Sequence, residues 1–143
     1  MVRVNLVRDK IRRLRNTAAA LSRCLPEQSQ ELRASRDALD LVAFRLYLAV
    51  QEAVDLCSHV ISDQGWGPLP TLRDHFSVLR DKGVLVPPVA DGLAAAIKVR
   101  NLIGHAYVDI DPDRLHAAAL ALQPLIDPFC AAVLSFAESH ADP

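Results

Sequence analysis

The residues best suited to chemistry lie in one short stretch, where an apolar segment ends at Arg100 and Asn101 and is followed by His105 and Tyr107. A neutral imidazole can remove the proton from a ribose 2′-hydroxyl, because an unperturbed imidazole titrates near neutral pH. A guanidinium fork can hold a phosphate and neutralise the charge that grows in the transition state. This combination would suit cleavage of RNA without a metal ion, in which the 2′-oxygen attacks the adjacent phosphorus and leaves a cyclic phosphate and a free 5′-hydroxyl.

The spacing of these residues sets a geometric condition. On an ideal helix two residues five apart differ by about 140° in direction, so Arg100 and His105 would diverge. Gly104 permits the chain to leave helical geometry, which would turn His105 toward the pocket of Arg100. In an extended chain Tyr107 would then share the side of His105. The same residue types are also typical of capping and packing groups at a helix end.

Cleavage needs a general acid as well, to protonate the leaving oxygen. One imidazole cannot easily serve as base and acid at the same time. A second His105, from a symmetry-related copy of the chain, could supply the proton. The chemistry therefore favours a homodimer.

The elements that must position these residues are helices. The spacing of apolar residues predicts an all-α fold, an antiparallel bundle of about five helices in a single domain over residues 1–143. Helices are expected over about 4–25, 29–62, 71–82 and 88–103, and from Asp111 onward. Pro124 and Pro128 should kink or split the last of these. The apolar stripe over 29–62 is wide enough for a central bundle helix, or for a helix that also meets a second subunit.

Composition limits the kinds of partner and site. The net charge of -1 gives no overall attraction to a polyanion, so RNA would have to meet a local basic surface. The basic residues near the start of the chain are one candidate, with a solvated helix face as the alternative; they are Arg3, Arg8, Lys10, Arg12, Arg13 and Arg15. Three widely spaced cysteines without metal-ligand spacing indicate a reduced, cytoplasmic protein with no metal site. No apolar run approaches the roughly 18 residues that would span a membrane.

The stretch from Arg36 to Phe129 resembles the HepT family of the HEPN superfamily. Its motif is Arg-x-x-x-x-His-x-Tyr, usually with a polar residue after the Arg, and Arg100, Asn101, His105 and Tyr107 match it without departure. The segments around Asp55 and around Arg73 resemble the family's second and third helices. The resemblance implies a HEPN-like, α-helical homodimer whose two motifs meet in a cleft, without a cofactor.

The resemblance also implies a function. It implies a ribonuclease toxin of a type VII-like toxin–antitoxin pair, acting on an RNA such as tRNA or mRNA, with Arg100 and His105 as catalytic residues. The partner would be an MntA-like nucleotidyltransferase antitoxin that transfers AMP from ATP to Tyr107. Added phosphates would place negative charge beside Arg100 and block an RNA phosphate. Asn101 and Asp55 are expected to bind substrate or to support the reacting groups.

Other readings remain open. The chain could be a non-catalytic HEPN module that binds a nucleotidyltransferase partner or a nucleotide, and a DNA-binding regulator ranks last because the segment after Gly83 is not basic. Asp55 and His59 are four residues apart and could simply pair on a helix surface. The remaining histidines, His75, His116 and His140, are expected to be solvated. The alternation of Asp109, Asp111 and Asp113 suits helix capping better than metal binding.

Overall fold

Residues 3–141, the part of the chain that the computed structural model describes, consist almost entirely of helices and contain no strand. The all-α prediction is therefore confirmed. The elements in chain order are α1 (Val4–Cys24), α2 (Gln30–Ala34), α3 (Arg36–Gln64), α4 (Arg73–Asp81), α5 (Pro87–Ala106), the short 3₁₀ helix η1 (Tyr107–Asp109) and α6 (Pro112–Ser139).

The described chain has six α-helices rather than five, because the predicted helix over 29–62 is broken at Ser35. Ser35 adopts an extended conformation, and its hydroxyl accepts a hydrogen bond from the backbone N–H of Ala38 at 3.2 Å. This is the geometry of an N-cap, which favours the start of a new helix over the continuation of the old one. At its other end α3 stops at Gly65, which has a φ of 68°. Glycine adopts that left-handed conformation without a steric penalty.

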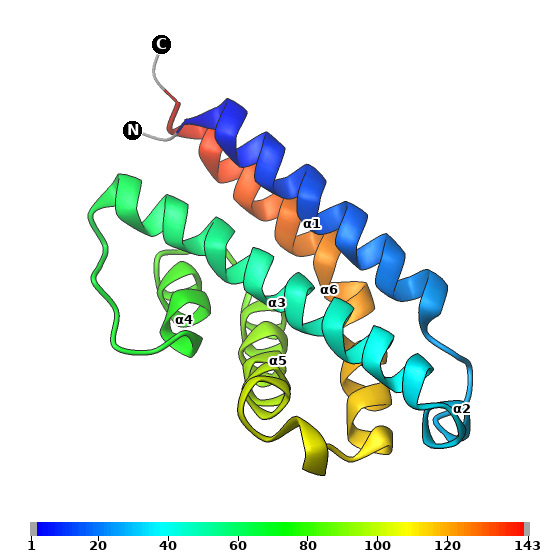
Figure 1. The fold of residues 1–143 in the computed structure, drawn as a ribbon. Helices are drawn as coiled ribbons and strands as arrows, with labels where there is room; N and C mark the ends of the chain where they lie inside the picture. The colour runs from blue at the N-terminus through cyan, green and yellow to red at the C-terminus, as the bar shows by residue number, and fades with distance from the viewer. Residues whose placement is uncertain (1–2, 142–143) are drawn as a thin grey trace.

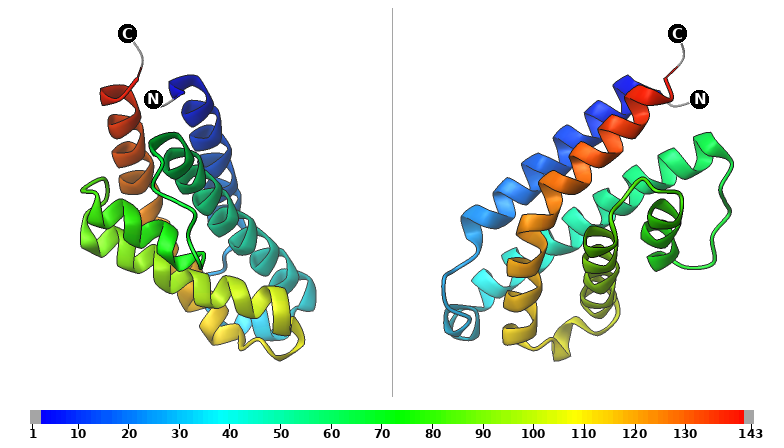
Figure 2. Two further views of the ribbon diagram at one scale, coloured as in Figure 1. Left: turned by 90° about the vertical axis from the view of Figure 1, so that its left-hand side faces the viewer. Right: turned by 180° about the vertical axis from the view of Figure 1, so that it is seen from behind.

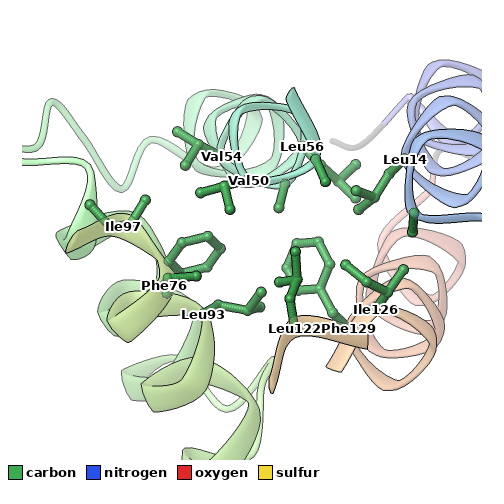
Figure 3. Packing of buried hydrophobic residues seen from close by; sticks show 14 of the residues in the cluster. Leu14, Val50, Val54, Leu56, Phe76, Leu93, Ile97, Leu122, Ile126 and Phe129 are labelled. Carbon is green, nitrogen blue, oxygen red and sulfur yellow. The ribbon is translucent and has the colours of Figure 1, made fainter. Parts of the chain in front are cut away.

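Three long helices and a pair of shorter ones form two sides of the molecule. α1 and α6 lie side by side and α1 also packs along α3, while α4 and α5 pack together on the other side of α3 (Figures 1 and 2). The buried side chains of these helices form one cluster. At its centre the rings of Phe76 and Phe129 meet edge to face, with centroids 6.1 Å apart, beneath Val50 of α3 (Figure 3).

α6 continues through both of its internal prolines, Pro124 and Pro128. The helix is bent in this region and is not split (Figure 2). Each proline removes one backbone donor and so favours a kink. Packing against α1 and α5 holds the helix together on both sides of the bend. α6 is long and apolar enough to cross a membrane by length and composition, which corrects the expectation from the sequence. Its apolar face, however, includes Leu122, Phe129 and Val133, which are buried in the core. These residues pack against α1 and α5, and in all one third of the most apolar 18-residue stretch of α6 is buried.

Four of the six basic residues near the start of the chain lie close to acidic side chains. Arg3, Arg8 and Arg15 each lie within 4 Å of an acidic side chain on α3 or α6, and Arg12 pairs with Asp9 on its own helix. These contacts favour the reading of a solvated helix face over a reserved RNA surface.

The loops before α5 and α6 fix the ends of the segment that carries the motif. Thr71 and Asp74 exchange hydrogen bonds as a capping box near the start of α4. Gly83, with a φ of 77°, follows its end. Asp111 caps α6 by accepting a hydrogen bond from the backbone N–H of Asp113 at 3.0 Å. The capping interpretation of this aspartate alternation is borne out.

Candidate functional site

Arg100 lies on the last part of α5 and faces α3, where its guanidinium is held on several sides. Nη2 donates hydrogen bonds to Tyr47 Oη and to Gln51 Oε1, both at 2.9 Å, and Nη1 donates to Asn101 Oδ1 at 3.0 Å. The centre of the guanidinium is 4.6 Å from the centroid of the Tyr47 ring, which adds a cation–π contact. The orientation of the fork is therefore fixed by α3 and by the neighbouring Asn101.

Not all N–H donors of the Arg100 guanidinium are used by hydrogen bonds within residues 3–141. Its Nε is buried and has no hydrogen-bond partner within residues 3–141. A guanidinium has five N–H donors, and the three hydrogen bonds to Tyr47, Gln51 and Asn101 leave two of them unused, the buried Nε–H and the second N–H of Nη1. A partly engaged, half-buried guanidinium of this kind suits an anion such as a phosphate.

Asp55 is connected to Arg100 indirectly, through the side chain of Gln51. Gln51 Nε2 donates to Asp55 Oδ1 at 3.1 Å, while the Oε1 of the same amide accepts from Arg100. Gln51 thus links Arg100 to Asp55, and Asp55 itself does not touch the guanidinium. The alternative pairing of Asp55 with His59 is wrong. His59 instead lies 3.2 Å from Asp63, and its burial lowers the pKa of the imidazole while Asp63 opposes the shift.

His105 is not brought to Arg100 within one chain. Gly104 does not interrupt α5, which continues to Ala106, so the predicted turn of His105 toward Arg100 is wrong. A single glycine lowers helix stability by only about 1 kcal/mol, and helix packing overrides that cost. The His105 side chain is exposed, and none of the residues 3–141 forms a hydrogen bond with it. Arg100 therefore faces α3 while His105 faces solvent.

The chain leaves helical geometry at Ala106, with φ -143° and ψ 42°, and Tyr107 then begins η1 instead of an extended segment. This turn carries Tyr107 back against the start of α3. Its hydroxyl donates a short hydrogen bond to Asp40 Oδ1. The same carboxylate oxygen lies 3.1 Å from Nε of Arg36, whose guanidinium sits 4.9 Å from the centroid of the Tyr107 ring. Burial, reinforced by the hydrogen bond to Asp40, raises the pKa of Tyr107 to about 12.

A shallow apolar hollow connects the surroundings of Arg100 and Tyr107. It has a volume of about 380 Å³ and is lined mainly by Phe44 and Tyr47 from α3 and by Ile103, Gly104 and Tyr107 from the other side. Phe44 is 62% exposed, which is unusual for a side chain of its size and polarity. The site therefore opens onto a surface that is partly apolar.

The site residues that the sequence reasoning missed all come from α3. They lie on one face of the helix together with two other residues, because successive members of the set are four, four, three, four and four positions apart. The set is Arg36, Asp40, Phe44, Tyr47, Gln51 and Asp55. That face contacts the end of α5. The feature of the sequence that indicates these residues is a polar stripe along one face of an otherwise apolar helix.

Two further expectations about histidines also change. His116 is buried, at 7% exposure, and its Nε2 lies 2.7 Å from the carbonyl oxygen of Pro26. His75 is half-buried, with its Nδ1 near the carbonyl oxygens of Thr71 and Leu72. Only His140 among the three is exposed as expected, and it stacks on Phe136. Within residues 3–141 no group of histidine, cysteine and acidic side chains could hold a metal ion.

Comparison with known proteins gives one family. The model of a family described as ribonuclease HepT-like matches residues 9–133. The chain is 23% identical over 104 residues to an mRNA nuclease HepT of Shewanella oneidensis, a match that covers 68% of this chain and 78% of that protein. It is 34% identical over 79 residues to a tRNA nuclease HepT of Aphanizomenon flos-aquae, covering 54% of each.

A solved structure shares the fold. The structure of a tri-AMPylated HEPN toxin of Shewanella oneidensis, in complex with an MNT antitoxin, superposes with a TM-score of 0.82 at 18% identity. The superposition covers 94% of this chain and 99% of that one. The arrangement of helices seen here is thus that of a HEPN toxin.

Proposed function

Because this chain belongs to the HepT-like ribonuclease family, we propose that it is a metal-independent endoribonuclease and the toxin of a HepT–MntA type toxin–antitoxin pair. The observation that carries the proposal is the guanidinium of Arg100, held in a fixed orientation by Tyr47, Gln51 and Asn101 beside an exposed histidine on the same helix end. The substrate would be a cytoplasmic RNA, since related nucleases act on mRNA and on tRNA.

In the proposed reaction Arg100 binds the phosphate at the cleavage site and offsets the charge that develops on it. His105 removes the proton from the neighbouring 2′-hydroxyl, and the 2′-oxygen attacks the phosphorus while the bond from the phosphorus to the 5′-oxygen breaks. The products are a cyclic phosphate and a free 5′-hydroxyl. Asn101 and Asp55 act by holding Arg100, one directly and the other through Gln51.

A second copy of the chain would complete the site. Arg100 and His105 point in different directions on one helix, and a leaving oxygen still needs a proton. In a symmetric dimer the two motifs would meet, so that the His105 of each copy would lie near the Arg100 of the other and one cleft would contain two imidazoles. Phe44 and Leu41, exposed next to each other on α3, are the apolar residues suited to this contact.

We therefore expect the purified protein to be a dimer at micromolar concentration, and Phe44→Glu to make it a monomer of 15.6 kDa. A carboxylate placed at a buried contact carries a large desolvation cost, whereas the same change on an open surface carries little. Light scattering measures the mass directly. Leu120→Glu, at an exposed leucine of α6, is the matched control and should leave the dimer intact. A monomeric wild-type protein would contradict the proposed assembly.

The catalytic role of Arg100 is tested with Arg100→Lys. Lysine keeps the charge but cannot donate at once to Tyr47, Gln51 and a phosphate in one plane. RNA cleavage in the presence of a chelator should fall by about 100-fold, on the order of the loss of one oriented donor in the transition state. Circular dichroism would verify that the fold survives. Unchanged cleavage by this variant would mean that the planar fork is not used.

Control of the toxin is proposed to pass through Tyr107. A nucleotidyltransferase antitoxin would transfer AMP from ATP to the Tyr107 hydroxyl, as the modified state of the related toxin suggests. The bulk and negative charge of the AMP would then lie in the hollow beside Tyr47 and obstruct the approach of RNA to Arg100.

A further inference from the structure

The surroundings of the Tyr107 hydroxyl contain a group that the proposed function does not use. Asp40 and Arg36 lie one turn apart at the start of α3, and both contact Tyr107. Their carboxylate and guanidinium also pair with each other at 3.1 Å. Neither residue touches Arg100 or the exposed His105 in the part of the chain that the structure describes. The cluster is therefore placed around the modified atom and apart from the residues that would cut RNA.

We propose that Asp40 accepts the phenolic proton when Tyr107 is nucleotidylated, so that the toxin supplies the base for its own modification. The inference rests on the proposed function, because it concerns the transfer of AMP to that hydroxyl. It goes beyond that function by naming Asp40, a residue of the toxin that receives the AMP, as the proton acceptor.

The step balances as a displacement at phosphorus. Tyr107 Oη forms a bond to the α-phosphorus of ATP, and the bond from that phosphorus to the oxygen shared with the β-phosphate breaks. Pyrophosphate leaves with the electron pair. The proton of the phenol moves along the existing hydrogen bond to the Asp40 carboxylate. Because the Asp40 side chain is 50% exposed, it can then release the proton to water.

A base is needed because the phenol holds its proton tightly. With its pKa raised to about 12, roughly one Tyr107 side chain in 10⁵ is ionised at pH 7. A carboxylate that already accepts the hydrogen bond removes the requirement for free phenolate.

The charged neighbours of this hydroxyl are Asp40 and Arg36 on α3, and His105 and Asp109 are exposed on its own segment.

Arg36 makes the arrangement compatible with an anionic substrate. A carboxylate beside the nucleophile would repel a triphosphate. The guanidinium of Arg36 offsets that charge at 3.1 Å and is itself 57% exposed, so that it remains able to meet a phosphate oxygen. Arg36 is thus a positioning residue in the proposal, and Asp40 is the group that moves a proton.

The experiment compares initial rates of AMP addition to purified variants, with the partner nucleotidyltransferase and MgATP, by intact-protein mass. Asp40→Asn keeps an oxygen that accepts the hydrogen bond but cannot take the proton. Its rate should fall by about 100-fold at pH 7, the typical effect of removing a general base. Its rate should also rise by about tenfold per pH unit up to pH 9, as free phenolate takes over. The wild-type rate should change little over this range.

The controls separate the possible failures. Asp37→Asn, an exposed carboxylate in the first turn of α3, should be modified at the wild-type rate, and Asp40→Glu should recover part of the rate. Asp40→Asn should still bind the partner and cleave RNA. A wild-type rate for Asp40→Asn, an equal loss at every pH, or loss of partner binding would overturn the proposal. If wild-type Tyr107 gains no AMP at all, the proposed function itself has failed.

Discussion

Cells that express His105→Ala should survive where cells that express the wild-type chain stop growing. The imidazole is the only group on the exposed end of α5 that can take a proton from a 2′-hydroxyl near neutral pH. Its removal should lower RNA cleavage by about 1000-fold, within the usual range for an acid–base group. Because the side chain is exposed and unbonded within residues 3–141, the stability of the fold should change by less than about 0.5 kcal/mol.

A matched control for this change is His75→Ala. His75 is a histidine of the same protein, outside the motif, whose Nδ1 lies near the main-chain carbonyls of Thr71 and Leu72. It should remain as toxic as the wild-type chain. If His105→Ala is equally toxic, His105 does not take part in the harmful activity, and the non-catalytic interpretation of the fold gains support.

The Tyr107→Phe variant should remain toxic even when the antitoxin is coexpressed. The substitution removes the one atom of that side chain that can accept AMP, together with its hydrogen bond to Asp40, and leaves the ring against the hollow. Coexpression with the nucleotidyltransferase should raise the mass of the wild-type chain by one or more AMP units and leave this variant unlabelled. Growth and intact mass are the two readouts.

Tyr47→Phe is the control for the loss of a hydroxyl at the same site. It removes an acceptor of Arg100, not the proposed site of modification, so it should still gain AMP. Labelling of Tyr107→Phe at another residue would overturn the assignment of the modified atom. Loss of toxicity in Tyr107→Phe without the antitoxin would assign this hydroxyl a part in RNA binding or catalysis.

The sequence predicted where most of the helices lie because the spacing of apolar residues indicates which segments are helical. It failed where local and tertiary effects compete. Gly104 was expected to end a helix, yet α5 continues for two residues beyond it and the chain turns at Ala106. Ser35 divides a segment whose apolar period is unbroken, because one hydroxyl caps the following helix. Neither outcome follows from hydrophobic periodicity.

The candidate site was predictable in part. Arg100, His105 and Tyr107 were identified through their motif, but the partners of Arg100 and Tyr107 on α3 lie about 50 to 70 residues away in the chain. Contacts over such separations depend on how α3 packs against α5, which a single sequence does not specify. The polar stripe that includes Asp40 and Gln51 becomes meaningful only when the facing helix is known.

The chemical ends of the RNA fragments test the central claim most directly. The purified chain is incubated with a defined RNA in the presence of a chelator, and the fragments are identified by mass. Attack by the 2′-hydroxyl predicts a 2′,3′-cyclic phosphate on one fragment and a free 5′-hydroxyl on the other, with neither formed by His105→Ala. Fragments with 3′-hydroxyl and 5′-phosphate ends, or cleavage only after a divalent metal is added, would contradict a metal-independent reaction at Arg100 and His105.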